Sequence, residues 1–373
     1  MSLQHCVSPY SQIDMRDVNL ELGGLLLDMA LIAGDEQRGW GYKRAAKAVF
    51  RLDRHITPLV EANTFKAVPG IGPTTDRIAR ELIHEGRSDT VERTVEESGQ
   101  GDKVAQARRL RHGFLSNAAV AGILEQDLAP SLRGYRGDFQ MHSIYSDGAE
   151  PLDSIAEACL ARGYRSAGMT DHSYGLPIAG GMPMARVAEQ HAAIEALNAH
   201  YGRRFRFFKG IEANIRADGT IDMEPGELRL FEFVVASPHS QLRQSGDQTA
   251  RMVAAVSQPG VSILGHPTGR KFNVRGGVRA KWDQVFAVAA KRQVAIEIDG
   301  SWDRQDVHFE MAARALELGC LFALDSDAHA NGELPFVDIA IAHARLAAIP
   351  EERIVNYWPN ARFLDWAKGA WDR

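Results

Sequence analysis

Short apolar runs that end in ionisable residues recur through residues 137–373, and longer helical patterns separate them. This alternation is typical of parallel α/β sheets and barrels. It constrains the fold strongly, because the carboxyl ends of parallel strands meet at one edge. The runs and the residues that follow them are 165–170 before Asp171 and His172, 205–210 before Glu212, 231–237 before His239, 261–265 before His266, 293–298 before Asp299, and 320–324 before Asp325, Asp327 and His329.

Imidazoles and carboxylates that converge at such an edge form the ligand set of a multi-metal site. A single histidine after a strand more often caps a helix or bonds within a loop, so no one position carries this prediction. The recurrence of the pattern along one chain does carry it. Two or three divalent ions would offset the repulsion among the carboxylates, generate hydroxide from water and hold a phosphoryl group.

The same residues resemble the motifs of the PHP (polymerase and histidinol phosphatase) family, over about residues 137–365. The resemblance implies an α/β fold, a distorted seven-stranded (β/α) barrel and a metal-dependent hydrolase. Residues 265–270 (GHPTGR) resemble more closely the PHP domain attached to bacterial family X DNA polymerases. The motifs are 137–143 (GDFQMHS) with 146–148 (SDG), 170–173 (TDHS), 210–212 (GIE), 237–240 (SPHS), 265–267 (GHP) and 325–329 (DSDAH).

The resemblance implies two or three divalent ions of zinc, manganese or iron. One residue, Glu212, would bridge two of these ions. The implied sets are His142, Glu212 and Asp327, with Gln140 at the position of a further ligand; Asp147, His172 and His329; and Glu212, His239 and His266.

Gln140 departs from the family pattern, in which the first motif is usually His-x-His. An amide oxygen is a weaker zinc ligand than an imidazole. We therefore expect Gln140 to coordinate weakly, to hydrogen-bond a metal-bound water, or to do neither. The change lowers the expected occupancy of that site or shifts its preference toward Mn²⁺.

The first 136 residues differ in pattern from the remainder. Apolar residues recur at helical spacing, as in residues 76–85, and a segment with Pro130 and Gly134 follows. We predict a small all-α domain over 1–100, a helical linker over 101–136 and the barrel over 137–373. The net charge of −5 argues against a uniformly basic nucleic-acid binder but allows a local binding patch.

Three features bear on location. Cys6, Cys159 and Cys320 are too scattered for a disulfide framework, which fits a reducing compartment. The N-terminal residues lack the basic and apolar regions of a signal peptide. No apolar run approaches the roughly 20 residues of a membrane span. We therefore expect a cytoplasmic protein without a membrane partner.

Residues 68–73 (VPGIGP) resemble a helix-hairpin-helix, and with 41–46 they resemble the small N-terminal domain of family X polymerases. Glycines allow a phosphate to approach the backbone, and N–H groups of the next helix then face it. Alone, such a turn commonly just joins two helices. With the PHP-like motifs downstream, we predict contact with DNA backbone phosphates. The residues are Val68, Gly70, Ile71, Gly72 and Thr74.

Two activities of family X polymerases are not expected. The interval between the hairpin and residue 137 is too short for fingers, palm and thumb, and it holds no paired-aspartate motif. Relatives with deoxyribose-phosphate lyase activity carry a Schiff-base lysine on the helix after the hairpin. This chain has no lysine between Lys66 and Lys103, and a guanidinium does not lose its proton to replace it.

Several residues near the motifs have two possible roles. Asp171 is a candidate to orient His172 or to accept a proton in catalysis. Arg270 is a candidate to bind a substrate phosphate, although an exposed loop arginine fits equally well. Asp299 and Arg304 follow a strand and could line the mouth of the barrel, and Asp299 could equally cap a helix.

Three predictions concern residues outside the motifs. Trp40 is expected to pack against other residues rather than stack on a base. His343 lies in a helical pattern and is expected at the surface. The basic cluster Arg108, Arg109 and Arg111 is expected on a solvated helix face rather than on phosphates.

These observations favour a metal-dependent phosphoesterase acting on DNA. The resemblance favours a 3′→5′ exonuclease or a 3′-end-processing phosphodiesterase in DNA repair. A metal-bound hydroxide would attack phosphorus while the metals stabilise the added charge. A small-molecule phosphatase of the histidinol-phosphatase kind stays open, but it leaves the hairpin without a purpose. A DNA-binding scaffold that has lost catalysis also stays open, and only Gln140 supports it.

Overall fold

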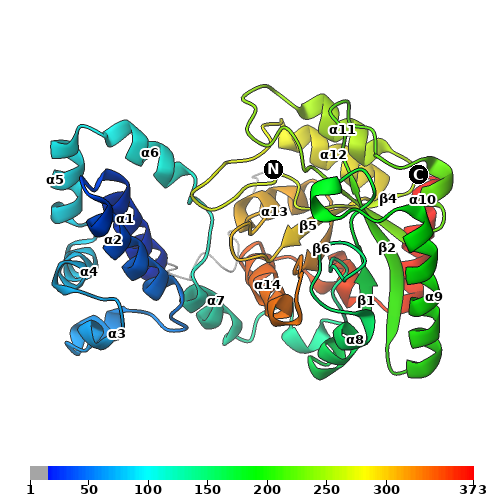
Figure 1. Cartoon of the computed structure of the whole chain (residues 1–373), viewed down its shortest axis with the longest axis horizontal. Coiled ribbons are helices and arrows are strands. Elements are labelled where there is room, and N and C mark those ends of the chain that lie inside the picture. The colour runs from blue at the N-terminus through cyan, green and yellow to red at the C-terminus, as the bar shows by residue number, and fades with distance from the viewer. Residues whose placement is uncertain (1–15) are drawn as a thin grey trace, which may run out of the picture. The chain divides into compact units, whose positions relative to one another are not determined.

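The computed structural model describes residues 16–373, so Cys6 and most of the segment tested for a signal peptide lie outside the described residues. The chain forms two compact units (Figure 1). One holds Met1–Gln126 with Phe272–Val274, and the other holds Asp127–Lys271 with Arg275–Arg373. Of the helices in the described part of the chain, none has both the length and the apolar character needed to span a bilayer.

The first unit is built from helices around one apolar core. Leu22 and Leu26 on α1 and Ile78 and Leu82 on α4 are buried in it, because i, i+4 spacing places each pair on one helix face. The helices are α1 (Val18–Ile32), α2 (Glu36–Phe50), α3 (Thr57–Glu61), α4 (Pro73–Glu85), α5 (Asp89–Ser98), α6 (Gly101–Arg109) and α7 (Asn117–Leu124).

Residues 101–136, expected as a linker, are divided between the two units. Helix α6 adds Val104 to the core of the first unit, and the boundary between the units falls after Gln126. Amphipathic spacing alone could not show this, because a linker helix and a core helix share the same pattern.

The basic cluster near the end of α6 is only partly solvated. Arg108 and Arg111 each donate to the carboxylate of Asp28 on α1, at 2.7 Å. Asp28 and Arg111 are buried, and removing one partner of a buried pair is strongly destabilising. These two arginines therefore fix the end of α6 to α1. The buried Arg111 corrects the predicted solvated face, whereas Arg108 and Arg109 are exposed.

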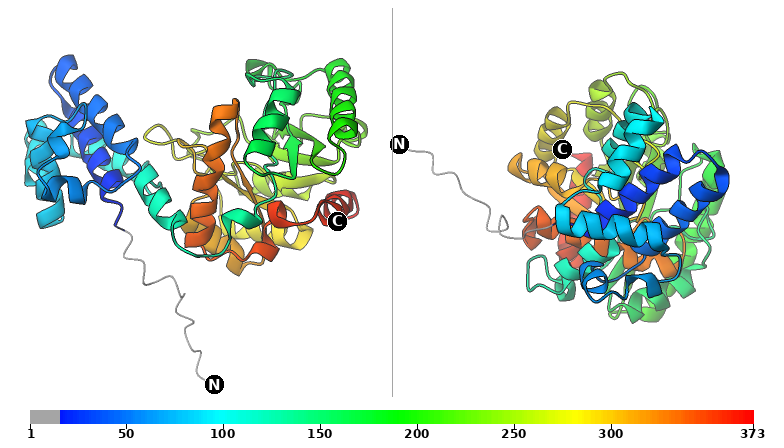
Figure 2. Two further views of the ribbon diagram at one scale, coloured as in Figure 1. Left: turned by 90° about the horizontal axis from the view of Figure 1, so that it is seen from below. Right: turned by 90° about the vertical axis from the view of Figure 1, so that its left-hand side faces the viewer.

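The second unit is a curved parallel sheet with helices packed around it (Figures 1 and 2). The strands pair in sequence order and all pairs are parallel. They are β1 (Ser166–Met169), β2 (Arg206–Asn214), β3 (Phe233–Ser237), β4 (Val261–Leu264), β5 (Ala295–Asp299) and β6 (Leu321–Asp325). The helices are α8 (Leu152–Ala161), α9 (Met184–Tyr201), α10 (Pro225–Leu228), α11 (Thr249–Ser257), α12 (Trp282–Arg292), α13 (Phe309–Glu317), α14 (Val337–Leu346) and α15 (Asn360–Lys368).

The predicted barrel has seven strands, whereas the sheet in residues 16–373 has six. Residues 137–142, the opening segment of the motif region, lie between the two edge strands. On one side they form backbone hydrogen bonds with β1. On the other side, the His142 N–H donates to Ala328 O at 2.9 Å. A regular ladder does not form because side chains take some of the segment's own N–H groups. For example, the backbone N–H of Phe139 donates to the Asp325 carboxylate at 2.7 Å.

Side chains alternate across each strand, so one face of every strand points into the curve of the sheet. Phe208 and Glu212 share this inner face of β2, with Gly210 between them. Phe363 of α15 packs on Phe208 and Phe233, with ring centroids 4.9 and 5.4 Å apart. A Cβ at Gly210 would lie 2.4 Å from the Phe233 ring, so only glycine fits there. The inner face is thus apolar at one end and ionisable at the other.

His343 on α14 is buried, contrary to its predicted place at the surface. The N–H of Phe309 donates to its Nδ1 at 3.2 Å, and its Nε2 lies 2.9 Å from Oε1 of Gln305. Burial and the charges of Arg270 and His308 hold its pKa well below the usual range. The ring is therefore neutral and donates from Nε2.

Candidate metal centre

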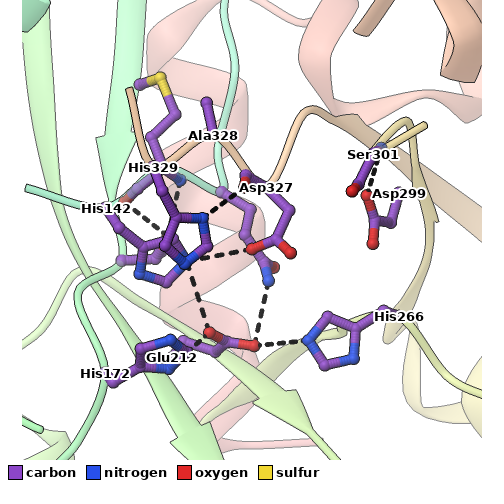
Figure 3. A network of polar contacts seen from close by, with 12 residues as sticks. His142, His172, Glu212, His266, Asp299, Ser301, Asp327, Ala328 and His329 are labelled. Carbon is purple, nitrogen blue, oxygen red and sulfur yellow. Dashed lines mark hydrogen bonds and ion pairs between the residues drawn. The ribbon is translucent and has the colours of Figure 1, made fainter. Parts of the chain in front are cut away.

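The strand ends bring the predicted metal ligands to one edge of the sheet (Figure 3). Glu212 belongs to β2, and His239, His266 and Asp327 follow β3, β4 and β6. Because their strands are parallel, residues far apart in sequence meet there. The side chains that gather are His142, Asp147, His172, Glu212, His239, His266, Asp327 and His329.

Glu212 lies at the centre of this cluster and is buried. Its Oε2 is 2.8 Å from His172 Nδ1 and 3.5 Å from His142 Nε2. Its Oε1 is 2.9 Å from His266 Nε2 and 3.4 Å from His239 Nε2. Figure 3 shows Glu212 between His172 and His266. A carboxylate whose two oxygens face different imidazoles is suited to bridge two ions.

Asp147 completes a second group with three imidazoles, whose ligand atoms all lie within 4.8 Å of one another. Asp147 Oδ1 is 3.6 Å from His172 Nε2 and 3.5 Å from His329 Nε2. The ring of His142 stacks between those of His172 and His329, with centroids 4.4 and 4.2 Å away. His142 also belongs to the group with Glu212 and Asp327.

Two carboxylates of the cluster, those of Glu212 and Asp327, are buried and yet have low pKa values. Burial opposes ionisation of Glu212, but the imidazoles of His172 and His239 hold its pKa well below the usual range. Burial likewise opposes ionisation of Asp327, and the positive charge of Arg304 outweighs it, so its pKa is also low. The cluster therefore offers anionic ligands across the neutral pH range.

Several buried polar atoms of the cluster have no hydrogen-bond partner among the described residues. Such atoms are rare in folded proteins, because each costs roughly 1–3 kcal/mol. Imidazole nitrogens and carboxylate oxygens are ligands that zinc, manganese and iron accept, so this donor set fits divalent cations. The atoms are Nδ1 of His142, His239 and His266.

Gln140 presents its amide nitrogen to the cluster. Its Nε2 donates to Glu212 Oε1 at 3.1 Å. Its Oε1 lies 3.2 Å from the position of a Cβ built on Gly265 and accepts no hydrogen bond from any described residue. In this arrangement the amide of Gln140 orients Glu212, and its coordination of a metal ion stays a prediction.

Asp171, considered above for catalysis, anchors the loop that carries Asp147. Its buried carboxylate accepts hydrogen bonds from the N–H and hydroxyl groups of both Ser143 and Ser146, and from the Gln190 side chain. These donors take up the lone pairs of the carboxylate. We therefore reassign Asp171 to positioning the loop.

Arg270, considered above for phosphate binding, is buried. Burial lowers its pKa to about 10, and the carboxylates of Asp306 and Glu310 act in the opposite direction. Arg304 is the arginine that contacts the cluster, with Nη1 2.9 Å from Asp327 Oδ2 and a side chain 25% exposed. In the sequence, only its place shortly after a strand end indicated this.

In the first unit, residues 68–72 form a tight turn before α4, at the predicted helix-hairpin-helix. Gly70 has a φ of +93°, which favours glycine. Gly72 is the N-cap of α4 and provides no side-chain cap, so early helix N–H groups such as that of Thr74 can face an anion. Val68 and Ile71 pack in or against the core. Their side chains therefore hold the turn.

A basic stripe on α2, formed by Trp40, Lys43, Arg44 and Lys47, adjoins this turn. All four side chains are exposed and follow helical spacing. Trp40 is 64% exposed, and Lys43 Nζ lies 5.7 Å from its ring centroid, which corrects the predicted packing role. A Cβ at Gly70 would lie 3.7 Å from Arg44 Cγ, so the turn and the stripe form one surface.

Comparison with known proteins finds relatives over about three-fifths of the chain. The DNA polymerase/3′-5′ exonuclease PolX of Bacillus subtilis (strain 168) is 34% identical over 222 residues, which are 59% of this chain and 39% of that protein. The chain thus matches well under half of this relative's length. A probable phosphatase of Enterobacter sp. (strain 638) is 30% identical over 244 residues, 62% of this chain and 93% of that protein.

The probable phosphatase YcdX of Escherichia coli (strain K12) is 28% identical over 241 residues, 60% of this chain and 91% of that protein. Among solved structures, histidinol phosphate phosphatase of Lactococcus lactis, in complex with zinc, L-histidinol and phosphate, covers 57% of this chain and 92% of its own. Its TM-score is 0.44 at 15% sequence identity. No family model matches the sequence.

Proposed function

This chain belongs to the PHP family of metal-dependent phosphoesterases, and we propose that it hydrolyses phosphodiester bonds in DNA. The observation that carries the proposal is the cluster around Glu212, in which imidazoles and ionised carboxylates surround one buried carboxylate. The same chain carries a helical unit whose exposed turn and basic stripe suit backbone phosphates.

Divalent cations held by the clustered ligands would acidify a bound water and offset charge on the phosphoryl group. The remaining residues position this machinery. Gln140 fixes Glu212 through its amide nitrogen, and Asp171 holds the loop of Asp147. Arg304 orients Asp327 and adds a positive charge beside it. In the net reaction a water oxygen bonds to phosphorus, the bond to the leaving oxygen breaks, and that oxygen takes up a proton.

The helical unit would hold DNA by its backbone. An uncapped helix N-terminus attracts a phosphate through its N–H groups and its dipole, and α4 begins in this way at Gly72. Lys43, Arg44 and Lys47 on the adjoining stripe of α2 would neutralise further phosphates. This binding requires no broad basic surface, which is consistent with a net charge of −5.

The finer assignment is a 3′→5′ exonuclease or a 3′-end-processing phosphodiesterase that acts in DNA repair. It draws on the similarity to the Bacillus subtilis protein, whose name includes a 3′-5′ exonuclease. A small-molecule phosphatase is the second candidate. It is favoured by the Enterobacter and Escherichia relatives, which match this chain over about nine-tenths of their length and are named as phosphatases.

The test is an assay of the full chain, loaded with Mn²⁺ or Zn²⁺, on 5′-labelled single-stranded DNA and on histidinol phosphate. We expect shortening of the DNA that His142→Ala abolishes and that His200→Ala leaves unchanged, because His200 is exposed on α9. Turnover of histidinol phosphate without cleavage of DNA would contradict the proposal and favour the second candidate.

A further inference from the structure

Three loops after neighbouring strands each carry an arginine at the edge that holds the metal ligands. Arg243 lies in the loop after β3, Arg275 in the loop after β4 and Arg304 in the loop after β5. These are the loops that follow the strands leading to His239, His266 and Asp299. The positive charges therefore lie on one side of the mouth.

Arg304 is the innermost of the three. Its Nη1 is 2.9 Å from Asp327 Oδ2 and 3.8 Å from Asp299 Oδ2. Its charge reaches the cluster through Asp327, whose Oδ1 lies 3.1 Å from His142 Nε2. A phosphoryl group bound at the cluster would therefore lie within reach of this guanidinium.

Arg275 lies next, on a rigid backbone. Lys271 and Arg275 exchange backbone hydrogen bonds of 2.9 and 3.1 Å, and the Arg275 Nε donates to Gly269 O at 2.8 Å. Arg275 makes no ion pair with any residue from 16 to 373, whereas Lys271 is paired with Asp303 at 2.8 Å. The guanidinium group of Arg275 is thus oriented by a backbone carbonyl, and no carboxylate in direct contact neutralises its charge.

Arg243 is exposed and lies at the outer end. Contacts between the loops bring the three arginines near one another. Lys271, which is bonded to Arg275 through the backbone, pairs with Asp303 beside Arg304, and a Cβ at Gly269, whose carbonyl accepts from Arg275, would lie 2.6 Å from Leu242 beside Arg243. Consistent with this, burial and the positive charges of Arg304 and Arg243 lower the pKa of Arg275. Holding like charges together raises the free energy, and an anion bound among them would remove this cost. Arg304 and Arg275 are half-buried, whereas Arg243 is exposed.

The opposite side of the mouth has a different character. Its loops expose apolar side chains, with Ile144 46% and Ile178 94% exposed. Ile144 precedes Asp147, and Ile178 lies in the loop after His172. One guanidinium, that of Arg186, also lies on this side, where it donates to the carbonyl oxygens of Ile144 and Tyr145. The row of arginines on successive loops lies on the other side.

We propose that Arg275 and Arg243 form a subsite for a second substrate phosphate, adjacent to the one hydrolysed at the metal cluster. This inference rests on the proposed function and narrows it. The site selects a polynucleotide strand over an isolated phosphate ester, because only a strand presents successive phosphates along the row from Arg304 outward. A small bisphosphate shares this chemistry, so the test separates the two.

The experiment measures KM and kcat of the full metal-loaded chain on three substrates. They are a single-stranded oligothymidylate, thymidine 3′,5′-bisphosphate and bis(p-nitrophenyl) phosphate, which has no second phosphate. The variants are Arg275→Ala and Arg243→Ala, with Arg279→Ala as the matched control, because Arg279 is exposed on the same loop.

We expect Arg275→Ala to raise KM for the oligothymidylate about tenfold with little change in kcat, as for loss of a charge-assisted hydrogen bond. Its kcat/KM on bis(p-nitrophenyl) phosphate should stay within about twofold of the parent value. The slope of log KM against log salt should fall by about 0.7 for each phosphate contact removed. Arg243→Ala should act in the same direction, and Arg279→Ala should match the parent protein.

Equal effects of Arg275→Ala on all substrates, or none on any, would overturn the subsite. If the parent protein cleaves DNA and both variants match Arg279→Ala, the subsite fails and the proposed function stands. If only the bisphosphate responds to Arg275→Ala, the second-phosphate subsite holds and the polynucleotide preference is wrong. If the parent protein cleaves none of the substrates, both proposals fail.

Discussion

Arg304 and Asp327 form an ion pair of 2.9 Å through Nη1 and Oδ2, while Oδ1 of the same carboxylate lies 3.1 Å from His142 Nε2. One carboxylate thus joins a fixed cation of the protein to the candidate metal ligands. Its two oxygens have separate tasks, since one is held by Arg304 and the other remains with the imidazole. The charge of Arg304 both orients Asp327 and competes with a bound metal ion.

Replacing Arg304 by glutamine separates these effects. Removal of a positive charge should leave metal affinity unchanged or higher, because the repulsion of a bound cation is lost. Loss of a charge-assisted contact to the substrate phosphate should raise KM about tenfold or more. Metal titration and steady-state kinetics on labelled DNA measure the two quantities. Arg314→Gln is the control, because Arg314 belongs to an exposed ion pair. Loss of metal with unchanged KM would contradict this role.

Metal binding should stabilise the fold through Glu212. A cation that binds only the folded state adds about 2.7 kcal/mol at a hundredfold excess over its Kd. We expect Mn²⁺ or Zn²⁺ to raise the Tm of the parent protein, and a chelator to reverse the rise. Glu212→Gln should remove most of this increase, since its carboxylate faces four of the imidazoles. A full increase in this variant would place the metals elsewhere.

His343 predicts a specific acid sensitivity. Its pKa is held well below the ordinary 6.5 in the folded state, so below pH 6.5 the unfolded chain binds more protons. Its contribution to stability is complete above that pH and is lost as the pH falls toward the folded value, by at most about 1.4 kcal/mol per pH unit.

Urea unfolding at pH 7.0 and 5.5 measures this contribution. His343→Gln should be less stable at pH 7.0 by roughly 1–3 kcal/mol, because a buried hydrogen-bond partner is lost. It should also lose less stability than the parent protein on acidification. His200→Gln, at an exposed position, should keep the parent slope. An unchanged slope in His343→Gln would show that other groups carry the acid sensitivity.

Gly210→Ala tests the packing beneath the cluster. The new Cβ would lie 2.4 Å from the Phe233 ring and 2.7 Å from Thr170, and overpacking of this kind typically costs about 1–3 kcal/mol. Gly226→Ala is the matched control, because nothing lies within 4 Å of its Cβ. Thermal or urea unfolding compares the two. Equal stabilities would mean that the Phe233 ring has room to move.

The convergence of the ligands was predictable from the sequence because it follows from topology. Once the strands are parallel, the residues after them must share one edge, as Glu212, His266 and Asp327 do. The resemblance to a known family added the grouping of the ligands around Glu212. Whether these groups bind metal ions stays a prediction that the experiments above address.

Features that depend on tertiary contacts were not predictable. The sequence of residues 137–142 does not reveal that side chains such as that of Asp325 accept hydrogen bonds from its N–H groups. His343 is predicted to be exposed because helical spacing in a sequence does not show that a helix is covered by other elements on several sides. From the sequence, Asp171 is a candidate to orient His172 or to accept a proton, because the two residues are adjacent in the chain. The sequence does not show its hydrogen bonds to distant donors.

The most direct test of the central claim combines metal content and hydrolysis in one sample. Metal analysis of the purified full chain, with DNA cleavage assayed in parallel, should give two or three Mn²⁺ or Zn²⁺ ions and activity in the parent protein. Glu212→Gln should lose both together, whereas His200→Ala should keep both. Metal-dependent DNA cleavage that survives in Glu212→Gln, or a fully loaded parent protein that cleaves no phosphoester, would contradict the account.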